Sequence, residues 1–175
     1  CWCSGRIARW TSCSTRTRCA AWCRSWGGGG WCTNCTIVGN TAGRIGGAPG
    51  SGIINSIVYF NSATDLPNLG GGSRFCCTTP QAGPNDVTSD PGFVDAAAGD
   101  FRLRADSPCI NAGKNAYITN LTDFAGNPRI VGGTVDIGAY EYQYPTSVLS
   151  YDWATQYGVP TDGSADFADP DGDSM

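Results

Sequence analysis

Short apolar cores recur along the middle of this chain at a constant interval. The string NCTIVGN at 34–40 returns as NSIVYFN at 55–61, 21 positions later, with both asparagines, the small second residue and the central apolar pair in the same places. A third copy, CCTT at 76–79, begins another 21 positions on. Glycine, asparagine, proline and serine, the usual turn residues, fill the intervals. A period of this length with β-branched cores predicts stacked β-coils, each of which buries its apolar face only against its neighbours.

Parallel coils stack like residues on like residues. The 21-residue register therefore predicts a column of small side chains, formed by Cys35, Ser56 and Cys77. The same register predicts an internal amide ladder that starts with Asn34 and Asn55. Neighbouring coils lie only about 4.8 Å apart, so we interpret the column as close packing rather than as a redox site. The spacing alone leaves a disulfide open.

The predicted fold class is all-β, a parallel β-helix (solenoid) fragment with an irregular C-terminal cap and a flexible tail. Segments 35–39, 56–60 and 76–79 are expected on successive coils, paired in parallel. A two-sheet sandwich also suits short strands between glycine-rich turns. The constant interval favours the solenoid, because hairpins have no reason to repeat Asn-small-x-apolar at a fixed spacing.

Composition agrees with a turn-rich β protein. The chain has 25 glycines, 10 prolines and 15% charged residues, and Lys114 and Glu141 are its single lysine and glutamate. It has no histidine, which excludes His-based triads and His metal sites. Residues 32–175 hold six basic against 15 acidic residues, a formal charge of −9. This acidic body argues against nucleic acid as a partner.

The first 31 residues differ from the rest. Five cysteines and five tryptophans are interleaved there with arginine, serine and threonine, without a period and without an acid. Three interpretations are open: a disulfide-stapled module, a zinc site, or a stretch read out of frame or disordered. We favour the third, because the sequence becomes orderly directly after the glycine run at 27–30. Proteolysis is then expected to remove residues 1–31 early.

After residue 80 the repeat gives way to strings rich in Asp, Pro and Gly. The motifs DPGFVD, GDFRL, SPCINAG, DFAGNPRI and VDIGAYEY follow one another between residues 90 and 142. In this order they resemble the C-terminal region of bacterial right-handed parallel β-helix proteins of the choice-of-anchor Q type, which are related in fold to pectate-lyase-like proteins. The resemblance covers roughly residues 32–143. It implies a right-handed β-helix on a large secreted or cell-surface protein, with β-helix coils at 32–80 and a C-terminal cap at 81–143, and it implies no single activity.

Single residues of this region predict local structure. Asp90 and Ser107 each precede a proline and suit turn initiation. Gly113 and Gly126 are expected at positions with positive φ. Cys109 is expected to be a small buried residue.

Four charged residues of the region suggest a buried ion-pair network, namely Asp123, Arg129, Asp136 and Glu141. The functional alternative is that Asp136 and Glu141 act on a glycosidic bond as acid and base or nucleophile. Five residues apart in a strand they would point to opposite faces, so a turn must bring them together. We favour the structural interpretation.

Lyase chemistry on acidic polysaccharides would need a cation and a basic residue that removes a proton. Arg102 and Arg104 are the nearby basic pair, and they alternate with apolar residues. We expect them on the outward face of a cap strand. The groove of an enzyme would then lie on coils upstream of this chain.

The tail, 144–175, opens with a proline-containing linker and ends in an acidic run. Asp169, Asp171 and Asp173 occupy positions 1, 3 and 5 of a calcium-loop pattern, which resembles the start of a dockerin or thrombospondin type 3 repeat. Position 6 is Ser174 rather than glycine, and position 12 lies beyond the last residue. A weak Ca²⁺ site and a plain solvated acidic tail both stay open.

These observations predict a non-catalytic structural or carbohydrate-contacting β-helix module of a secreted or cell-surface bacterial protein. The alternative is a fragment of a polysaccharide lyase or glycoside hydrolase whose active site lies mostly upstream. Polysaccharide is the expected partner, calcium the expected ion, and no residue stands out as catalytic. No apolar run reaches about 18 residues, so no membrane span is expected.

Overall fold

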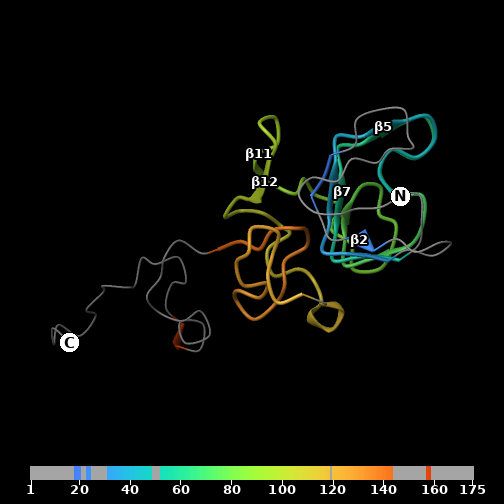
Figure 1. Ribbon diagram of the computed structural model, residues 1–175. Coiled ribbons are helices and arrows are strands. Elements are labelled where there is room, and N and C mark those ends of the chain that lie inside the picture. The colour runs from blue at the N-terminus through green and yellow to red at the C-terminus, as the bar shows by residue number, and fades with distance from the viewer. Residues whose placement is uncertain are drawn as a thin grey trace, which may run out of the picture.

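The computed structural model describes residues 18–20, 23–24, 31–48, 52–118, 120–143 and 157–158. Strands and turns make up nearly all of this part, which also holds the 3₁₀ turn η1 (Asn115–Tyr117) (Figure 1). None of its helices is long and apolar enough to cross a membrane. The strands are β1 (Arg18–Ala20), β2 (Cys23–Arg24), β3 (Trp31–Thr33), β4 (Thr36–Val38), β5 (Thr41–Ala42), β6 (Ile53–Ile54), β7 (Ile57–Tyr59), β8 (Ser62–Ala63), β9 (Ser73–Arg74), β10 (Cys77–Thr78), β11 (Phe93–Asp95) and β12 (Asp100–Leu103).

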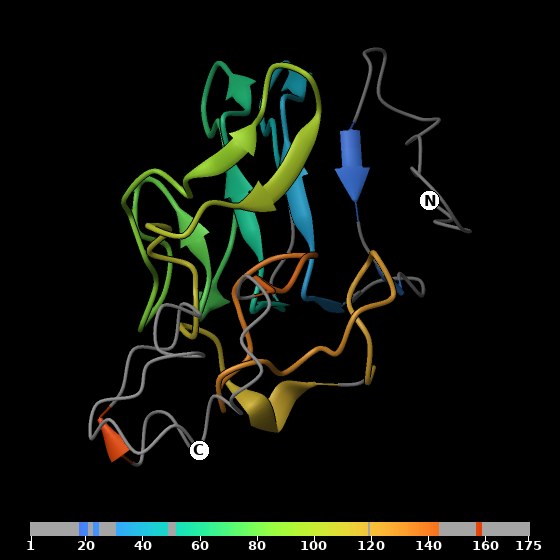
Figure 2. The same cartoon turned by 90° about the vertical axis from the view of Figure 1, so that its left-hand side faces the viewer.

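Parallel pairing relates three successive repeats. The first repeat is β3–β5, the second β6–β8, and the third β9 and β10; like strands pair as β3-β6-β9, β4-β7-β10 and β5-β8. Figure 2 shows β4, β7 and β10 side by side, coloured from blue to green. Thr36 lies opposite Ile57, and Ala48 lies opposite Leu69. The parallel order of segments 35–39, 56–60 and 76–79 is therefore confirmed, and the 21-residue offset is confirmed for the strands of the first two repeats.

The third repeat pairs with a shift of 20 residues instead of 21. The shortening lies in the glycine-rich turn before β9. Leu69 stands four positions before Ser73, whereas its partner Ala48 stands five positions before Ile53. One residue is thus missing from this turn, and every later strand residue moves by one place along its neighbour.

This shift corrects the predicted column of small side chains. Cys76, rather than Cys77, takes the place of Cys35 and Ser56, because Cys77 lies opposite the residue after Ser56. The three column residues are fully buried. Each donates its side-chain hydrogen to the carbonyl oxygen two residues before it, at 3.4, 2.7 and 3.4 Å in chain order. Sulfur and oxygen therefore serve the same packing and hydrogen-bonding role here.

The residue before each column position turns the chain at a corner. Asn34, Asn55 and Phe75 have φ values of 53°, 48° and 54°, in the left-handed region that asparagine tolerates better than most residues. The predicted internal ladder of Asn34 and Asn55 is wrong, because this backbone turns their amides toward later residues. Asn55 Oδ1 accepts from the Lys114 N–H at 2.9 Å and Asn55 Nδ2 donates to its carbonyl at 3.0 Å. Asn34 Nδ2 donates to the Asp136 carbonyl at 3.4 Å.

An amide ladder does exist, and it starts six residues further along the first two repeats, at Asn40 and Asn61. Asn61 Oδ1 accepts from the backbone N–H and the side-chain amide of Asn40, at 3.0 and 2.8 Å. Asn61 Nδ2 donates in turn to Asn68 Oδ1 at 3.1 Å, and Asn68 Nδ2 donates to the Thr79 carbonyl at 2.7 Å. The ladder is buried, and it ties all three repeats together at a second corner.

Two clusters of buried residues form the core. The first lies inside the repeats and contains Cys35, Ile37, Ala48, Ile53, Val58, Leu69 and Cys76. The second joins the repeats to the cap segment (residues 81–143) and contains Val38, Ile57, Cys77, Phe93, Leu103, Cys109 and Ile137. Because the cap segment supplies four residues of the second cluster, it is part of the same folded body.

The cap segment contacts the repeats in two places. Over the open edge of β10, Val87 forms a parallel bridge with Cys77. Along the corner, Gly138 N donates to the Asn55 carbonyl at 2.9 Å, and Ala139 N donates to Thr36 Oγ1 at 3.0 Å. The corner contacts reach back to the first repeat, so this segment lies along the side of the stack as well as at its end.

The turn predictions for the cap segment hold with one exception. Gly126 has φ +91° and Cys109 is fully buried, as expected. Gly113 is not among the positive-φ residues. A Cβ there would lie 2.7 Å from the Val135 carbonyl oxygen. Close backbone approach, rather than backbone conformation, therefore requires glycine at position 113.

Two antiparallel strands precede the repeats. β1 pairs with β4 and β2 pairs with β3, which fills the second edge of each of these sheets. The other residues before Trp31 lie outside the described part of the chain. The alternatives for residues 1–31 thus stay predictions.

Candidate functional site

Four charged side chains are buried together in the cap segment. Asp123, Arg129, Asp136 and Glu141 are each at most 4% exposed. Arg129 Nη1 lies 4.0 Å from Glu141 Oε2. The predicted buried network is therefore present, with three carboxylates around one guanidinium.

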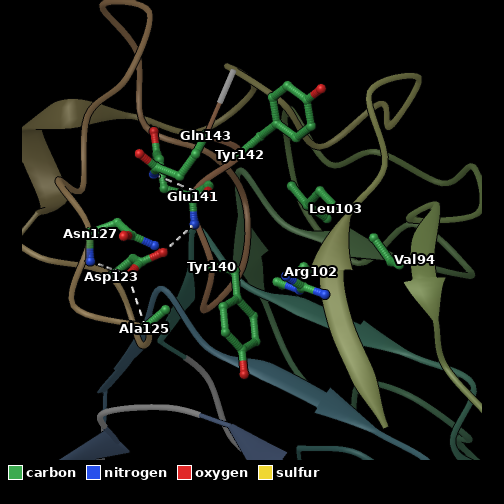
Figure 3. Close-up of a pocket in the computed structure, with 10 residues that line it drawn as sticks. All are labelled: Val94, Arg102, Leu103, Asp123, Ala125, Asn127, Tyr140, Glu141, Tyr142 and Gln143. Carbon is green, nitrogen blue, oxygen red and sulfur yellow. Dashed lines mark hydrogen bonds between the residues drawn. The ribbon is translucent and has the colours of Figure 1, made fainter. Parts of the chain in front are cut away.

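Asp123 organises the first loop of this network. Its Oδ1 accepts from the backbone N–H of Ala125 at 2.9 Å and of Asn127 at 2.8 Å. Its Oδ2 accepts from the N–H of Glu141 at 3.1 Å (Figure 3). One carboxylate thus closes the 123–127 turn and attaches it to the end of the cap segment.

Asp136 and Glu141 hold the second loop. Asp136 accepts from the N–H groups of Asn111 and Tyr142, at 2.7 and 2.6 Å. Glu141 accepts from the N–H groups of Val131 and Asp136, at 3.1 and 3.2 Å. A turn at 137–140 brings the two residues together, as the five-residue spacing required. Every carboxylate oxygen named here accepts a hydrogen bond from a backbone N–H group. In a regular sheet, the carbonyl oxygens of a neighbouring strand would accept these bonds.

Arg129 supplies the donors on the other side of this turn. Its Nη1 and Nη2 donate to the carbonyl oxygens of Gly138 and Ala139, at 3.2 and 2.8 Å. Burial lowers the pKa of Arg129, and the nearby carboxylate of Glu141 opposes that effect. The guanidinium therefore completes the hydrogen bonds of the stretch that docks on the corner.

Burial also shifts the acids. It raises the pKa of Asp136 to about 6 and that of Glu141 to about 8, the latter with a further contribution from the nearby charge of Asp136. A carboxyl group with such a pKa could donate a proton near neutral pH. The Glu141 side chain is 0% exposed, however. In this structure both acids are hydrogen-bonded to backbone N–H groups of the cap segment.

A pocket of about 300 Å³ lies above this network, between the β11–β12 hairpin and residues 123–143 (Figure 3). Its lining residues are Val94, Arg102, Leu103, Asp123, Ala125, Asn127, Tyr140, Glu141, Tyr142 and Gln143. The Tyr140 ring lies near its centre and is held edge-on by Phe124, with 5.5 Å between ring centroids. The wall thus combines an aromatic ring with amide and guanidinium groups. Sequence reasoning missed Tyr140, Asn127 and Gln143 as site residues, although the first lies in the VDIGAYEY motif.

Arg102 and Arg104 point outward, as predicted, and both are exposed. Each is paired with an acid two residues away. Arg102 Nη2 lies 2.5 Å from Asp100 Oδ2, and Arg104 Nε lies 3.0 Å from Asp106 Oδ1. The hydrogen bond with Asp100 raises the pKa of Arg102. That direction is opposite to the one a proton-abstracting base needs.

The calcium candidates Asp169, Asp171 and Asp173 lie outside the described residues. Within the described ranges, no group of three or more Cys, Asp or Glu side chains is arranged to hold a metal ion. The calcium prediction therefore stays a prediction about the tail.

Comparisons with protein-family models, with curated proteins and with solved structures found no match.

Proposed function

We propose that this chain is a structural, non-catalytic module of a secreted or cell-surface bacterial protein, folded as a right-handed parallel β-helix. The observation that carries the proposal is the docking of the cap segment along the corner that Asn34 and Asn55 form. Asn55 exchanges two hydrogen bonds with Lys114 and accepts a third from Gly138, while Asn34 bonds to Asp136. These contacts use the corner residues of two repeats, so the cap segment is fastened along the side of the stack as well as at its end. The choice-of-anchor Q resemblance supports the same architecture.

The buried acids support a structural role. The carboxylate oxygens of Asp123, Asp136 and Glu141 accept hydrogen bonds from backbone N–H groups of an irregular segment. Removing one partner from such a network leaves buried groups unpaired, which is costly. A cap held this way protects the open strand edge, which would otherwise template association with other chains.

The pocket supports contact with polysaccharide. Sugar rings present apolar C–H faces that pack on aromatic rings, and hydroxyl groups that pair with planar amide and guanidinium groups. Tyr140 supplies the ring, while Asn127, Gln143 and Arg102 supply the polar groups around it. The pocket is open and small, which suits one or two sugar units of a longer chain.

We also propose that Asp169, Asp171 and Asp173 hold Ca²⁺ weakly, as the oxygen-rich spacing of the tail suggests.

A binding screen with polysaccharides tests the proposal. The full chain should bind at least one neutral or acidic polysaccharide, and Tyr140→Ala should weaken this binding at least tenfold. Phe60→Ala is the matched control, because Phe60 is also aromatic and 49% exposed but is not among the pocket residues. Equal binding by wild type and Tyr140→Ala, or none by wild type, would remove the carbohydrate contact. Release of unsaturated or newly reducing sugars would instead show that the chain is an enzyme fragment.

A further inference from the structure

Two thiols from distant parts of the chain meet in the second core cluster. Cys77 lies on β10 in the third repeat, and Cys109 follows the turn at Ser107 in the cap segment. Both are 0% exposed, and both belong to the cluster that joins the repeats to the cap segment. Both are free thiols in this structure, and Cys77 Sγ donates to the Ser89 carbonyl oxygen at 3.3 Å. Cys109 lies close enough to raise the pKa of Cys77. The cluster thus brings together residues 32 positions apart in the sequence.

The backbone holds both residues firmly in place. Cys77 N donates to the Ser56 carbonyl at 2.9 Å. Cys109 N donates to Ser107 Oγ at 3.1 Å, and its carbonyl accepts from Ile137 N at 2.9 Å. The two thiols are therefore positioned by main-chain bonds that exist independently of any contact between the sulfur atoms.

The neighbouring thiol has a different environment. Cys76 points into the first core cluster and donates to the carbonyl oxygens of Ile53 and Arg74, each at 3.4 Å. Alternation along β10 thus sends adjacent cysteines to opposite sides of the sheet. The geometry singles out Cys77 as the partner of Cys109.

We propose that Cys77 and Cys109 form a disulfide bond that attaches the cap segment to the third repeat. A low-molecular-weight disulfide such as oxidised glutathione is the oxidant. One protein thiolate attacks it, which forms a mixed disulfide and releases one reduced thiol. The second protein thiolate attacks the mixed disulfide, forms the Cys77–Cys109 bond and releases the second reduced thiol, so two protein thiols are oxidised and one oxidant disulfide is reduced. The bond needs the Cys77 thiol to leave the Ser89 carbonyl oxygen and turn toward Cys109 within the cluster that both residues share.

Burial determines when this reaction takes place. The hydrogen bond with Cys109 and burial raise the pKa of Cys77, so the folded protein offers little thiolate to an oxidant. The bond therefore forms as the chain folds, before the cluster closes. This inference does not depend on the proposed contact with polysaccharide.

Peptide mapping of the refolded full chain tests the proposal. The protein is refolded with reduced and oxidised glutathione, alkylated without reduction and digested with trypsin. Cleavage after Arg74, Arg102, Arg104 and Lys114 releases peptides 75–102 and 105–114. We expect these two peptides to be joined, with fragmentation placing the link on Cys77. Two alkylated thiols at 77 and 109, or a link through Cys76, would overturn the proposal.

Two variants sharpen the test. Cys76→Ser should keep the cross-link, because Ser56 already fills the equivalent place in the second repeat, whereas Cys109→Ser should lose it. Oxidised wild type should also melt about 5–10 °C above the same protein kept in dithiothreitol, and Cys109→Ser should show no such difference. A melting temperature that dithiothreitol leaves unchanged in wild type would contradict the link even if a minor cross-linked peptide were found.

Discussion

Asn61 lies directly beside Asn40, 21 residues earlier in the chain, and one oxygen joins them. Asn61 Oδ1 accepts both the backbone N–H and the side-chain amide of Asn40, at 3.0 and 2.8 Å. Asn61 Nδ2 donates to the carbonyl oxygens of Ile37 and Tyr59, at 2.9 and 3.0 Å. A single buried amide thus links two repeats by side-chain and main-chain bonds together.

Replacing this amide should destabilise the whole stack. Asn61→Ala removes the two hydrogen bonds that Asn40 donates to Asn61 Oδ1 and the bonds that Asn61 Nδ2 donates, and a buried polar group that loses its partner costs about 1–3 kcal/mol. We expect the free energy of unfolding, measured by urea denaturation, to fall by about 3 kcal/mol. Asn120→Ala, at an exposed position, is the control and should change it by less than about 0.5 kcal/mol. A similar small effect for both variants would show that the ladder contributes little.

A methyl group at Gly138 should separate the cap segment from the corner. Gly138 has φ +121°, and a Cβ there would lie 2.8 Å from Ile57 Cδ1 and 3.2 Å from Thr36 Oγ1. Gly138→Ala therefore combines backbone strain with a steric clash. We expect protection of the Gly138 and Ala139 amides from hydrogen exchange to fall at least tenfold. Gly126→Ala also has positive φ but meets nothing within 4 Å, so it should leave those amides protected.

The stability of the cap segment should fall as pH rises from about 5 to about 8. Burial raises the folded-state pKa of Glu141 from 4.5 to about 8 and that of Asp136 from 3.8 to about 6. The folded protein therefore holds more protons than the unfolded chain across this range, so it is favoured at the acidic end. Arg129 and Asp123 are the other charges that face the pair, and Arg129 opposes the shift in both acids.

Urea denaturation at pH 5, 6.5 and 8 measures this effect. Glu141→Gln should be less stable than wild type at pH 5, since its amide meets N–H donors, but its stability should depend much less on pH. Asp65→Asn, at an exposed carboxylate, should retain the wild-type slope. A wild-type stability that rises toward pH 8 would mean that both acids are charged in the folded state without cost.

The tail should bind Ca²⁺ weakly. Asp169, Asp171 and Asp173 offer three carboxylates at alternating positions, whereas Ser174 stands where a calcium loop needs glycine. Calorimetric titration should therefore give a dissociation constant near or above the millimolar range. Asp171→Asn should weaken it further, and a version extended to include an acid at position 12 should bind tightly. No heat in either the chain or its extended version would leave a plain acidic tail.

The sequence period was sufficient to predict the parallel strands but not the register of the third repeat. The missing residue falls in the glycine turn before Ser73. Successive glycines look alike in the sequence, so nothing there shows that one position has been lost. Cys76 and Cys77 are both small and both cysteine, so either one fits the column in an alignment. Only the main-chain pairing of Cys77 with Ile57 decides between them.

The sequence predicted the buried charged residues of the candidate site but not the pocket beside them. Asp123, Arg129, Asp136 and Glu141 could be foreseen because unpaired charges are rarely left near a core. The outward turn of Asn34 depends on a left-handed backbone, which asparagine permits but does not require. The pocket depends on how two loops far apart in sequence approach each other, and no local pattern encodes that.

The register of the strands tests the central claim most directly. Nuclear Overhauser contacts between backbone protons of the isotopically labelled chain would report which residues face each other. We predict parallel-type contacts that place Thr36 beside Ile57 and Ile57 beside Cys77, a shift of 21 and then of 20 residues. Antiparallel contacts between these strands, or contacts that place Ile57 beside Thr78, would contradict the stacked repeat as described.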